Sequence, residues 1–359
     1  MKKLLQFLIV LSVFNVLPFG QAQAEQRSTH NAQSLKDTFA KDFLVGVSLN
    51  PRNVRNAAEQ DLIRQQFNSV TCENVMKPKE IHPSANVWKW EEADRIANFC
   101  RENGIKMRGH CLVWHNQFSD WMLYDEMGNF VKKEVFYARL KDHIQKVMTR
   151  YKDVIYAWDV VNEAMSDGGP NPYRESKLYQ MCGDEFIAKA FQFAREADPK
   201  AILFYNDYNE CDPRKSKNIY NMVLKMRSEG VPIDGIGMQG HYNIYGPTVE
   251  ELDAALSLYA PLVEHIHVTE LDVRVNREMG GQLRFSQEGL AISDSVQSLH
   301  AQQYERLFKT FRKYRDKIDC VTFWNLHDGC SWLGARNYPL LFDASLQPKP
   351  AYFRLVDKK

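Results

Sequence analysis

The chain has 359 residues, of which 44% are apolar, 12% aromatic and 25% charged, and this composition excludes disordered, collagenous and small disulfide-stapled proteins. Lysine and arginine number 46, against 45 aspartate and glutamate residues. Because no excess of positive charge is present to bind a phosphate backbone, nucleic acid is not an expected partner.

The first 24 residues are expected to be a signal peptide. Two lysines precede an apolar run over residues 4–19 that is short for a membrane span, and Ala22-Gln23-Ala24 has the small-x-small pattern of a signal peptidase site. Cleavage after Ala24 leaves one catalytic domain, residues 25–359, that starts with Glu25 and not with a cysteine that could be lipidated. The sequence therefore predicts a secreted or periplasmic monomer that is not attached to the membrane.

Eight short apolar runs alternate with longer amphipathic segments along the mature chain. The runs are residues 43–49, 67–73, 106–114, 156–161, 201–206, 233–239, 265–271 and 319–325, and helices are predicted at 134–151 and 185–197 among the segments between them. A strand followed by a helix, eight times over about 300 residues, predicts a (β/α)8 TIM barrel. An open doubly wound sheet is the rival, but the glycine-rich loop that usually follows its first strand is replaced here by Leu49-Asn50-Pro51-Arg52-Asn53.

The seven cysteines have neither CxxC nor zinc-type spacing, so most are expected to be buried thiols. Cys182 with Cys211, and Cys320 with Cys330, remain open as disulfide pairs.

Polar residues follow seven of the eight predicted strands, at the end of a barrel where active sites lie. Glu163 ends the fourth strand and Glu270 the seventh. Two carboxyls that face each other across a groove can cleave a glycosidic bond, one as proton donor and the other as nucleophile. His241 and Asp272 are placed to hydrogen-bond toward Glu270 and keep it ionised. The pattern therefore predicts Glu270 as the nucleophile and Glu163 as the acid/base.

Other side chains at this rim are candidate sugar contacts. Asn162 offers an amide beside Glu163, and Trp114, Trp324 and Trp332 lie at or beyond strand ends, where indole rings can stack on sugars. Lys77 and Gln117 fit either a sugar contact or an ordinary loop residue. Trp88, Trp90 and Trp158 are assigned to packing.

Two histidine pairs raise the alternative of a zinc-dependent hydrolase. His265 and His267 form an H-x-H pair, and His110 and His115 are close in sequence. The H-x-H pair falls below the rim, however, so neither a metal nor another cofactor is expected.

The sequence motifs resemble those of the family 10 glycoside hydrolases, chiefly endo-β-1,4-xylanases. The motifs are TCENVMKP, GHCLVWHNQ, WDVVNEA, YNDYN, GMQGHY, VTELDV and FWNLHDGCSW followed by PLLFD, and together they extend over about residues 45–352. The sequence departs from the family pattern at Asn116, Ser119 and residues 325–328, which bears on subsite preference.

The resemblance implies the same two carboxyls, with Asp272 supporting His241. It also implies a set of substrate-binding residues, with Tyr208 on the leaving-group side: Glu73, Asn74, Lys77, His110, Trp114, Asn162, Tyr208, Gln239, His241, Trp324 and Trp332. The implied activity is retaining cleavage of internal bonds in xylan or xylo-oligosaccharides. A β-1,4-glucan or mixed-linkage activity and a non-catalytic carbohydrate-binding barrel are the alternatives.

Overall fold

The computed structural model describes residues 34–276 and 292–357, and parallel strands form its centre. The barrel strands are β1 (Leu44–Leu49), β2 (Ser69–Cys72), β3 (Lys106–Trp114), β4 (Ile155–Asn162), β5 (Ile202–Asp207), β6 (Gly235–Met238), β8 (His265–Arg274) and β9 (Ile318–Phe323). Each pairs with the next in this order, and β9 pairs back with β1. The sheet is therefore closed as a (β/α)8 barrel, and the open-sheet alternative is wrong.

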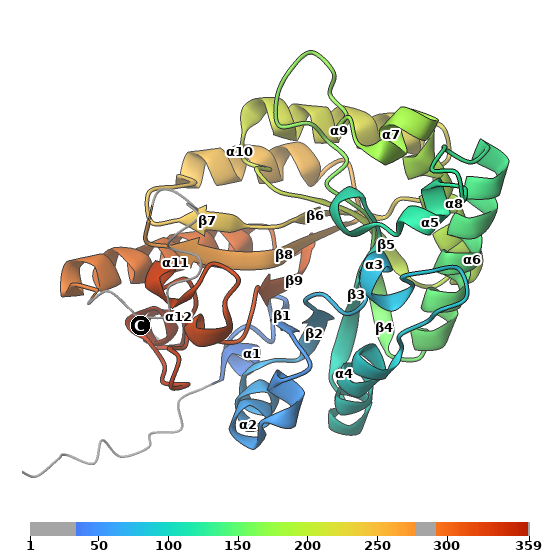
Figure 1. Ribbon diagram of the computed structural model, residues 1–359. Helices are drawn as coiled ribbons and strands as arrows, with labels where there is room; N and C mark the ends of the chain where they lie inside the picture. Colours follow the sequence, from blue (N-terminus) through green and yellow to red (C-terminus); the bar gives the residue numbers. More distant parts are fainter. Residues whose placement is uncertain (1–33, 277–291, 358–359) are drawn as a thin grey trace, which may run out of the picture. The chain divides into compact units, whose positions relative to one another are not determined.

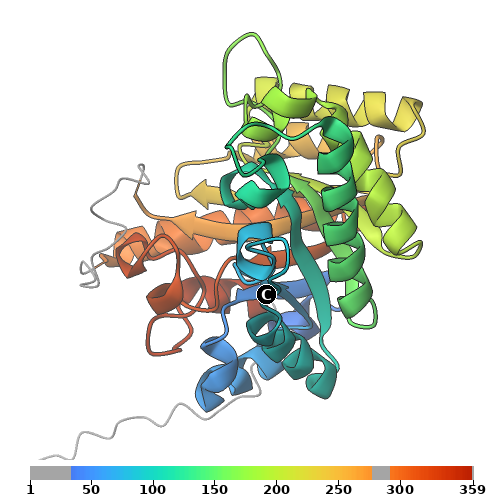
Figure 2. The same cartoon turned by 45° about the vertical axis from the view of Figure 1, so that its right-hand side comes forward.

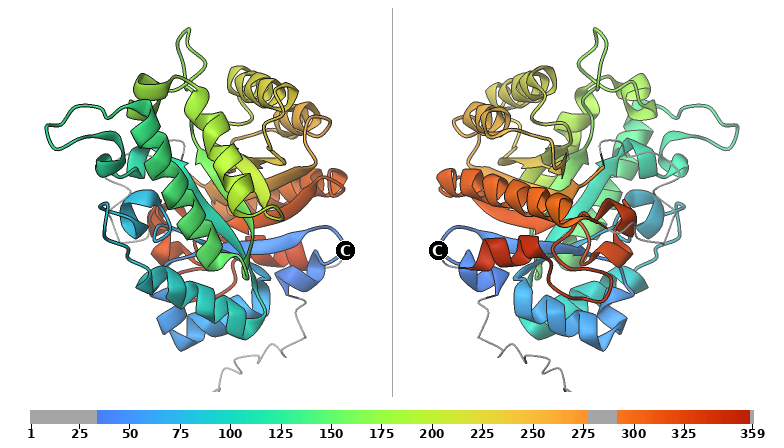
Figure 3. Two further views of the ribbon diagram at one scale, coloured as in Figure 1. Left: turned by 90° about the vertical axis from the view of Figure 1, so that its right-hand side faces the viewer. Right: turned by 90° about the vertical axis from the view of Figure 1, so that its left-hand side faces the viewer.

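Helices surround the strands on the outside of the barrel (Figure 1; Figure 2). In Figure 3, the neighbouring helices α6 and α8 lie side by side on this outer layer. The helices within the described residues are α1 (Leu35–Thr38), α2 (Ala57–Gln66), α3 (Pro78–Ile81), α4 (Glu91–Asn103), α5 (Asp120–Leu123), α6 (Lys133–Tyr151), α7 (Lys177–Cys182), α8 (Glu185–Ala197), α9 (Pro213–Ser228), α10 (Val249–Tyr259), α11 (Asp294–Lys313) and α12 (Pro350–Val356).

Local sequence signals explain where several of these helices begin and end. Helix α10 begins with a capping box, in which the Thr248 side chain and the Glu251 side chain each accept a backbone N–H of the other residue. Helix α9 has Asp212 as its N-cap and Pro213 at its first position. Helix α4 ends at Gly104, whose φ of 63° is a conformation that glycine adopts without strain.

Each of the eight predicted runs coincides with or overlaps a barrel strand, and the helix predicted at 185–197 has these bounds in the structure. One strand was not predicted. After β6 the chain turns at Gly240, with φ 77°, and forms the short strand β7 (His241–Asn243), which pairs with the far end of β8. In this register His241 lies opposite Asp272, so the turn brings the imidazole beside the carboxyl end of β8.

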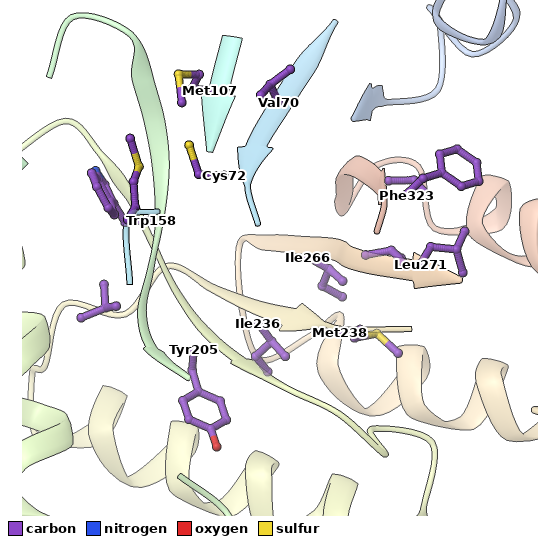
Figure 4. Close-up of a cluster of buried hydrophobic side chains, with 14 of the residues drawn as sticks. Val70, Cys72, Met107, Trp158, Tyr205, Ile236, Met238, Ile266, Leu271 and Phe323 are labelled. Carbon is purple, nitrogen blue, oxygen red and sulfur yellow. The ribbon is translucent and has the colours of Figure 1, made fainter. Parts of the chain in front are cut away.

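The apolar side chains form one buried core cluster. Val70, Trp158, Ile236 and Leu271 are among its members in Figure 4. All seven cysteines are free, so neither open disulfide pair forms, and five of them are buried as expected. Within the described residues, no helix has both the length and the apolar character needed to cross a bilayer. The predicted signal peptide, residues 1–24, lies outside the described residues.

Candidate active site

A groove of about 540 Å³ opens at the carboxyl ends of the barrel strands. Both glutamates and all the predicted sugar contacts line it, and Asp272, which is fully buried, supports it from beneath. The lining residues are Glu73, Asn74, Lys77, His110, Trp114, Asn116, Gln117, Asn162, Glu163, Tyr208, Asn209, Gln239, His241, Glu270, Arg274, Trp324 and Trp332.

Glu163 directly follows β4 and has a left-handed backbone with φ 58°. Its N–H donates to the Asn206 carbonyl at 2.9 Å. Its two carboxyl oxygens accept hydrogen bonds from neutral groups: Oε1 from Gln239 Nε2 at 2.9 Å and Oε2 from Trp114 Nε1 at 2.7 Å. A non-glycine residue in this conformation is strained and needs such surrounding support, which is characteristic of functional positions.

Glu270 lies within β8 in a very different electrostatic setting. His241 joins two carboxylates: its Nε2 is 3.1 Å from Glu270 Oε2, and its Nδ1 is 2.9 Å from Asp272 Oδ2. Burial alone would lower the pKa of His241, but Asp272 and Glu270 raise it to about 10. Burial alone would likewise raise the pKa of Glu270, but His241, with His110 and Lys77 nearby, lowers it to about 2. Glu270 is therefore an ionised carboxylate beside an imidazolium.

A chain of amide groups connects the two glutamates. Asn206 Nδ2 donates to Glu270 Oε1 and to Asn162 Oδ1, each at 2.9 Å. Gln239 Nε2, which bonds Glu163, is also 3.3 Å from Asn162 Oδ1. Thr269 Oγ1 donates to Asn206 Oδ1 at 2.7 Å and so fixes which end of that amide faces Glu270. The two carboxyls are thus held in one hydrogen-bonded frame but with different neighbours.

One side of the groove combines charged and aromatic groups suited to sugar hydroxyls. Lys77 is buried, donates to Asn74 Oδ1 at 2.8 Å and lies 4.6 Å from the centre of the Trp114 ring. The rings of Trp324 and His110 pack edge to face, with ring centres 5.3 Å apart. Burial raises the pKa of Glu73 above its ordinary value. Hydroxyl groups that both donate and accept are the ligands such a mixture can satisfy.

Trp332 hydrogen-bonds to Asp272, the residue that supports Glu270 through His241. Its indole N–H donates to Asp272 Oδ2 at 2.8 Å, and its ring lies 4.9 Å from that of His241. Its backbone N–H donates to Asn325 Oδ1 at 2.9 Å, where Asn325 has φ 84° after β9. Trp332 therefore contributes to the position of Asp272 as well as to the groove wall.

Three of the four histidines that raised the zinc alternative bond to other side chains. His110, which lines the groove, has its Nδ1 2.8 Å from Asp159, and Asp159 is also paired with the buried guanidinium of Arg108. Arg108 Nε in turn donates to His267 Nδ1 at 3.0 Å, and His265 Nδ1 is 2.6 Å from Asp319. Across residues 34–276 and 292–357, no group of three or more histidine, cysteine, aspartate or glutamate side chains is arranged to hold a metal.

Sequence reasoning did not select four residues that belong to the site. Asn206 bonds Glu270, while Asn116, Asn209 and Arg274 line the groove. Asn206 and Asn209 belong to the polar run after the fifth strand, and Arg274 follows Glu270 and Asp272 at strand period two, which places the three on one face. These sequence patterns indicate that the residues lie near the site, but they do not reveal which side chains contact one another.

The family model for glycosyl hydrolase family 10 matches residues 34–358, almost all of the described chain. The chain belongs to glycoside hydrolase family 10. Among curated members, an endo-1,4-β-xylanase/feruloyl esterase of Xylanibacter ruminicola is 56% identical over 328 residues, which are 88% of this chain but 45% of that protein. Endo-1,4-β-xylanase B of Paenibacillus barcinonensis is 42% identical over 329 residues, which are 90% of this chain and 97% of that protein.

Solved structures share the same fold over nearly the whole described chain. A psychrophilic family 10 endo-β-1,4-xylanase matches with a TM-score of 0.86 and 54% identity, and the match covers 91% of this chain and 100% of that one. A variant solved in complex with xylotriose matches with a TM-score of 0.85 and 36% identity, over 90% of this chain and 99% of that one.

Proposed function

We propose that this family 10 member cleaves internal β-1,4 bonds of xylan with retention of anomeric configuration, with Glu270 as nucleophile and Glu163 as acid/base. The observation that carries the assignment is the unequal setting of the two carboxyls: Glu270 is bonded to a protonated His241, whereas Glu163 accepts hydrogen bonds from the neutral groups of Gln239 and Trp114. A carboxylate held ionised by a cation is suited to attack, and this leaves the acid/base role to Glu163.

The reaction has two displacement steps at the anomeric carbon. In the first, Glu270 attacks this carbon while Glu163 gives its proton to the glycosidic oxygen, so the C–O bond breaks and a covalent glycosyl-enzyme forms. In the second, Glu163 takes a proton from water, and the water oxygen displaces Glu270 from the same carbon. Two inversions give net retention, and Glu163 regains its proton for the next turnover.

Xylan and xylo-oligosaccharides are the substrate class, and endo-1,4-β-xylanase activity is the enzyme's activity. Family 10 membership and the xylanase relatives support this activity, and the xylotriose complex of a relative supports the ligand class. In our proposal the groove residues bind successive sugars: Glu73, Lys77 and His110 on the glycone side, and Tyr208 on the leaving-group side.

We also propose that residues 1–24 direct export and are removed, and that the mature enzyme is a monomer. The basic residues, the apolar run and Ala22-Gln23-Ala24 support export. N-terminal sequencing of protein recovered from the periplasm or medium should begin at Glu25, and recovery of only the uncleaved chain from the cytoplasm would contradict the proposal. Light scattering of the mature enzyme should give the mass of one chain.

Alanine variants of the two glutamates test the catalytic roles. We expect Glu270→Ala to lose turnover by several orders of magnitude on every substrate. We expect Glu163→Ala to lose most activity on xylan. With a dinitrophenyl xylobioside kcat/KM should fall little, because such a leaving group needs no proton, whereas kcat should fall, because hydrolysis of the glycosyl-enzyme lacks its base. Glu264→Ala, which alters an exposed carboxylate paired with Arg227, is the control that keeps wild-type rates.

The same variants carry further readouts. Azide should restore turnover of the dinitrophenyl substrate to Glu163→Ala and form a β-glycosyl azide, because a small anion can enter where the carboxyl stood. NMR of the first product formed by the wild type should show the β-anomer. An α-anomer, or a Glu163→Ala variant equally impaired with all leaving groups, would rule out the proposed mechanism.

A further inference from the structure

The strained backbone at Glu163 is held from several directions. Its N–H donates to the Asn206 carbonyl, and its own carbonyl accepts from Arg174 Nε, each at 2.9 Å. The next two residues, Ala164 and Met165, are buried, and their N–H groups need partners inside the protein. Whatever receives these two N–H groups helps to set the direction in which the Glu163 side chain leaves the barrel.

One side chain receives both, and Met165 N also reaches Asp207 Oδ2 at 3.4 Å. The hydroxyl of Tyr205, on β5, accepts from Ala164 N at 2.9 Å and from Met165 N at 3.0 Å. The same hydroxyl donates to Asp207 Oδ2 at 2.5 Å. Its two acceptor positions and its one donor are thus all used. Tyr205 is fully buried, and its ring packs among the core side chains (Figure 4).

Asp207 anchors the tyrosine from the same face of β5, two residues further on. Its carboxyl is fully buried, lies 3.1 Å from Lys215 Nζ and accepts from Tyr208 N at 2.9 Å. Lys215 also reaches the loop after Glu163, with Nζ 2.7 Å from Asp167 Oδ1. Burial raises the pKa of Asp207 to about 7 against the opposing effect of Lys215, and the charge of Glu163 adds to the rise.

We propose that Tyr205, anchored by Asp207, is a positioning residue for Glu163, since its hydroxyl fixes the two peptide groups that follow the acid/base. This inference rests on the proposed role of Glu163 as acid/base. Neither Tyr205 nor Asp207 lines the groove, so neither is placed to touch substrate. Loss of the hydroxyl should therefore impair proton transfer to the leaving group and leave the nucleophile on Glu270 intact.

Tyr205→Phe tests the proposal because it removes the hydroxyl and keeps the ring. For xylobiosides with leaving groups of graded acidity, we expect kcat/KM to fall about tenfold to hundredfold with phenol and by less than about threefold with dinitrophenol, since only the poorer leaving group needs its proton. Tyr151→Phe is the matched control: Tyr151 is also fully buried and donates to an aspartate, Asp94, at 3.0 Å, but it lies on α6. It should keep wild-type rates with every leaving group.

A double variant separates positioning from general damage to the fold. In a Glu163→Ala background, Tyr205→Phe should cause no further loss, because a residue that acts through Glu163 has nothing left to position. A further loss in that background, or an equal loss for all leaving groups, would overturn the proposal. If Tyr205→Phe does not fold, Asp207→Ala is the variant to test. Loss of this anchor should give the same dependence of kcat/KM on the leaving group. An equal loss for all leaving groups would overturn the proposal.

The outcomes also distinguish this proposal from the function on which it rests. Glu163→Ala without any dependence on leaving group contradicts the acid/base assignment itself. Glu163→Ala with that dependence, together with Tyr205→Phe without it, leaves the assignment in place and overturns only the role of Tyr205.

Discussion

Replacement of His241 by alanine tests how Glu270 is kept ionised inside the protein. Burial acts to raise the pKa of Glu270, and the hydrogen bond from His241 is the largest of the effects that lower it, from the ordinary 4.5 to about 2. A difference of that size corresponds to about 3 kcal/mol in favour of the carboxylate. Without His241, burial should prevail and the pKa of Glu270 should rise above its ordinary value.

The sign of the pH effect follows from this shift. In the wild type the pKa of Glu270 is lower in the folded than in the unfolded protein, so its contribution to stability is present above the ordinary pKa of 4.5 and is lost as pH falls toward 2. The nucleophile therefore stays ionised throughout the mildly acidic range. In His241→Ala it should become protonated in that range, and the rate of glycosyl-enzyme formation should fall with it.

The assay is the pH dependence of kcat/KM with a dinitrophenyl xylobioside, which needs the nucleophile but not the acid. We expect the acidic limb of the profile to move upward by about 2 pH units or more in His241→Ala. His265→Ala is the matched control. His265 begins β8, the strand that carries Glu270, but its imidazole pairs with Asp319 and not with Glu270. An acidic limb that stays in place in His241→Ala would refute the idea that this histidine holds Glu270 ionised.

Two predictions concern stability. A Cβ at Gly109 would lie 2.1 Å from the Trp158 ring, so Gly109→Ala should lower the free energy of unfolding by about 1–3 kcal/mol, seen as a lower Tm; an unchanged Tm would show that the ring moves freely. In the wild type the Asp328 carboxylate is buried and lies 2.7 Å from Lys349 Nζ. Lys349→Met removes this cation and should lower the free energy of unfolding, measured with denaturant, by about 3–5 kcal/mol. The double variant Lys349→Met/Asp328→Asn should recover part of that loss, and a double variant no more stable than the single one would contradict this account.

The sequence alone was sufficient for the order of elements and for most of the groove. Strand runs and helix periodicity are local properties, so the eight barrel strands and helix α8 were found at their places. In a parallel barrel all strand ends of one kind meet at one rim, and residues such as Glu163, Gln239 and Trp332 could therefore be assigned to one groove from their positions after strands.

Apart from the contacts that link Asp272, His241 and Glu270, which the sequence predicted, only the tertiary structure decided which of these side chains bond to one another. Periodicity gives the face of a strand on which a residue lies, but distances between strands depend on the stagger with which the barrel closes. The Trp114 indole thus donates to Glu163, and Asn206 reaches Glu270, although neither contact has a counterpart in residue spacing. The hydroxyl of Tyr205 likewise meets the peptides after Glu163 because β4 and β5 are neighbours in a fixed register, a relation that no single segment of the sequence contains.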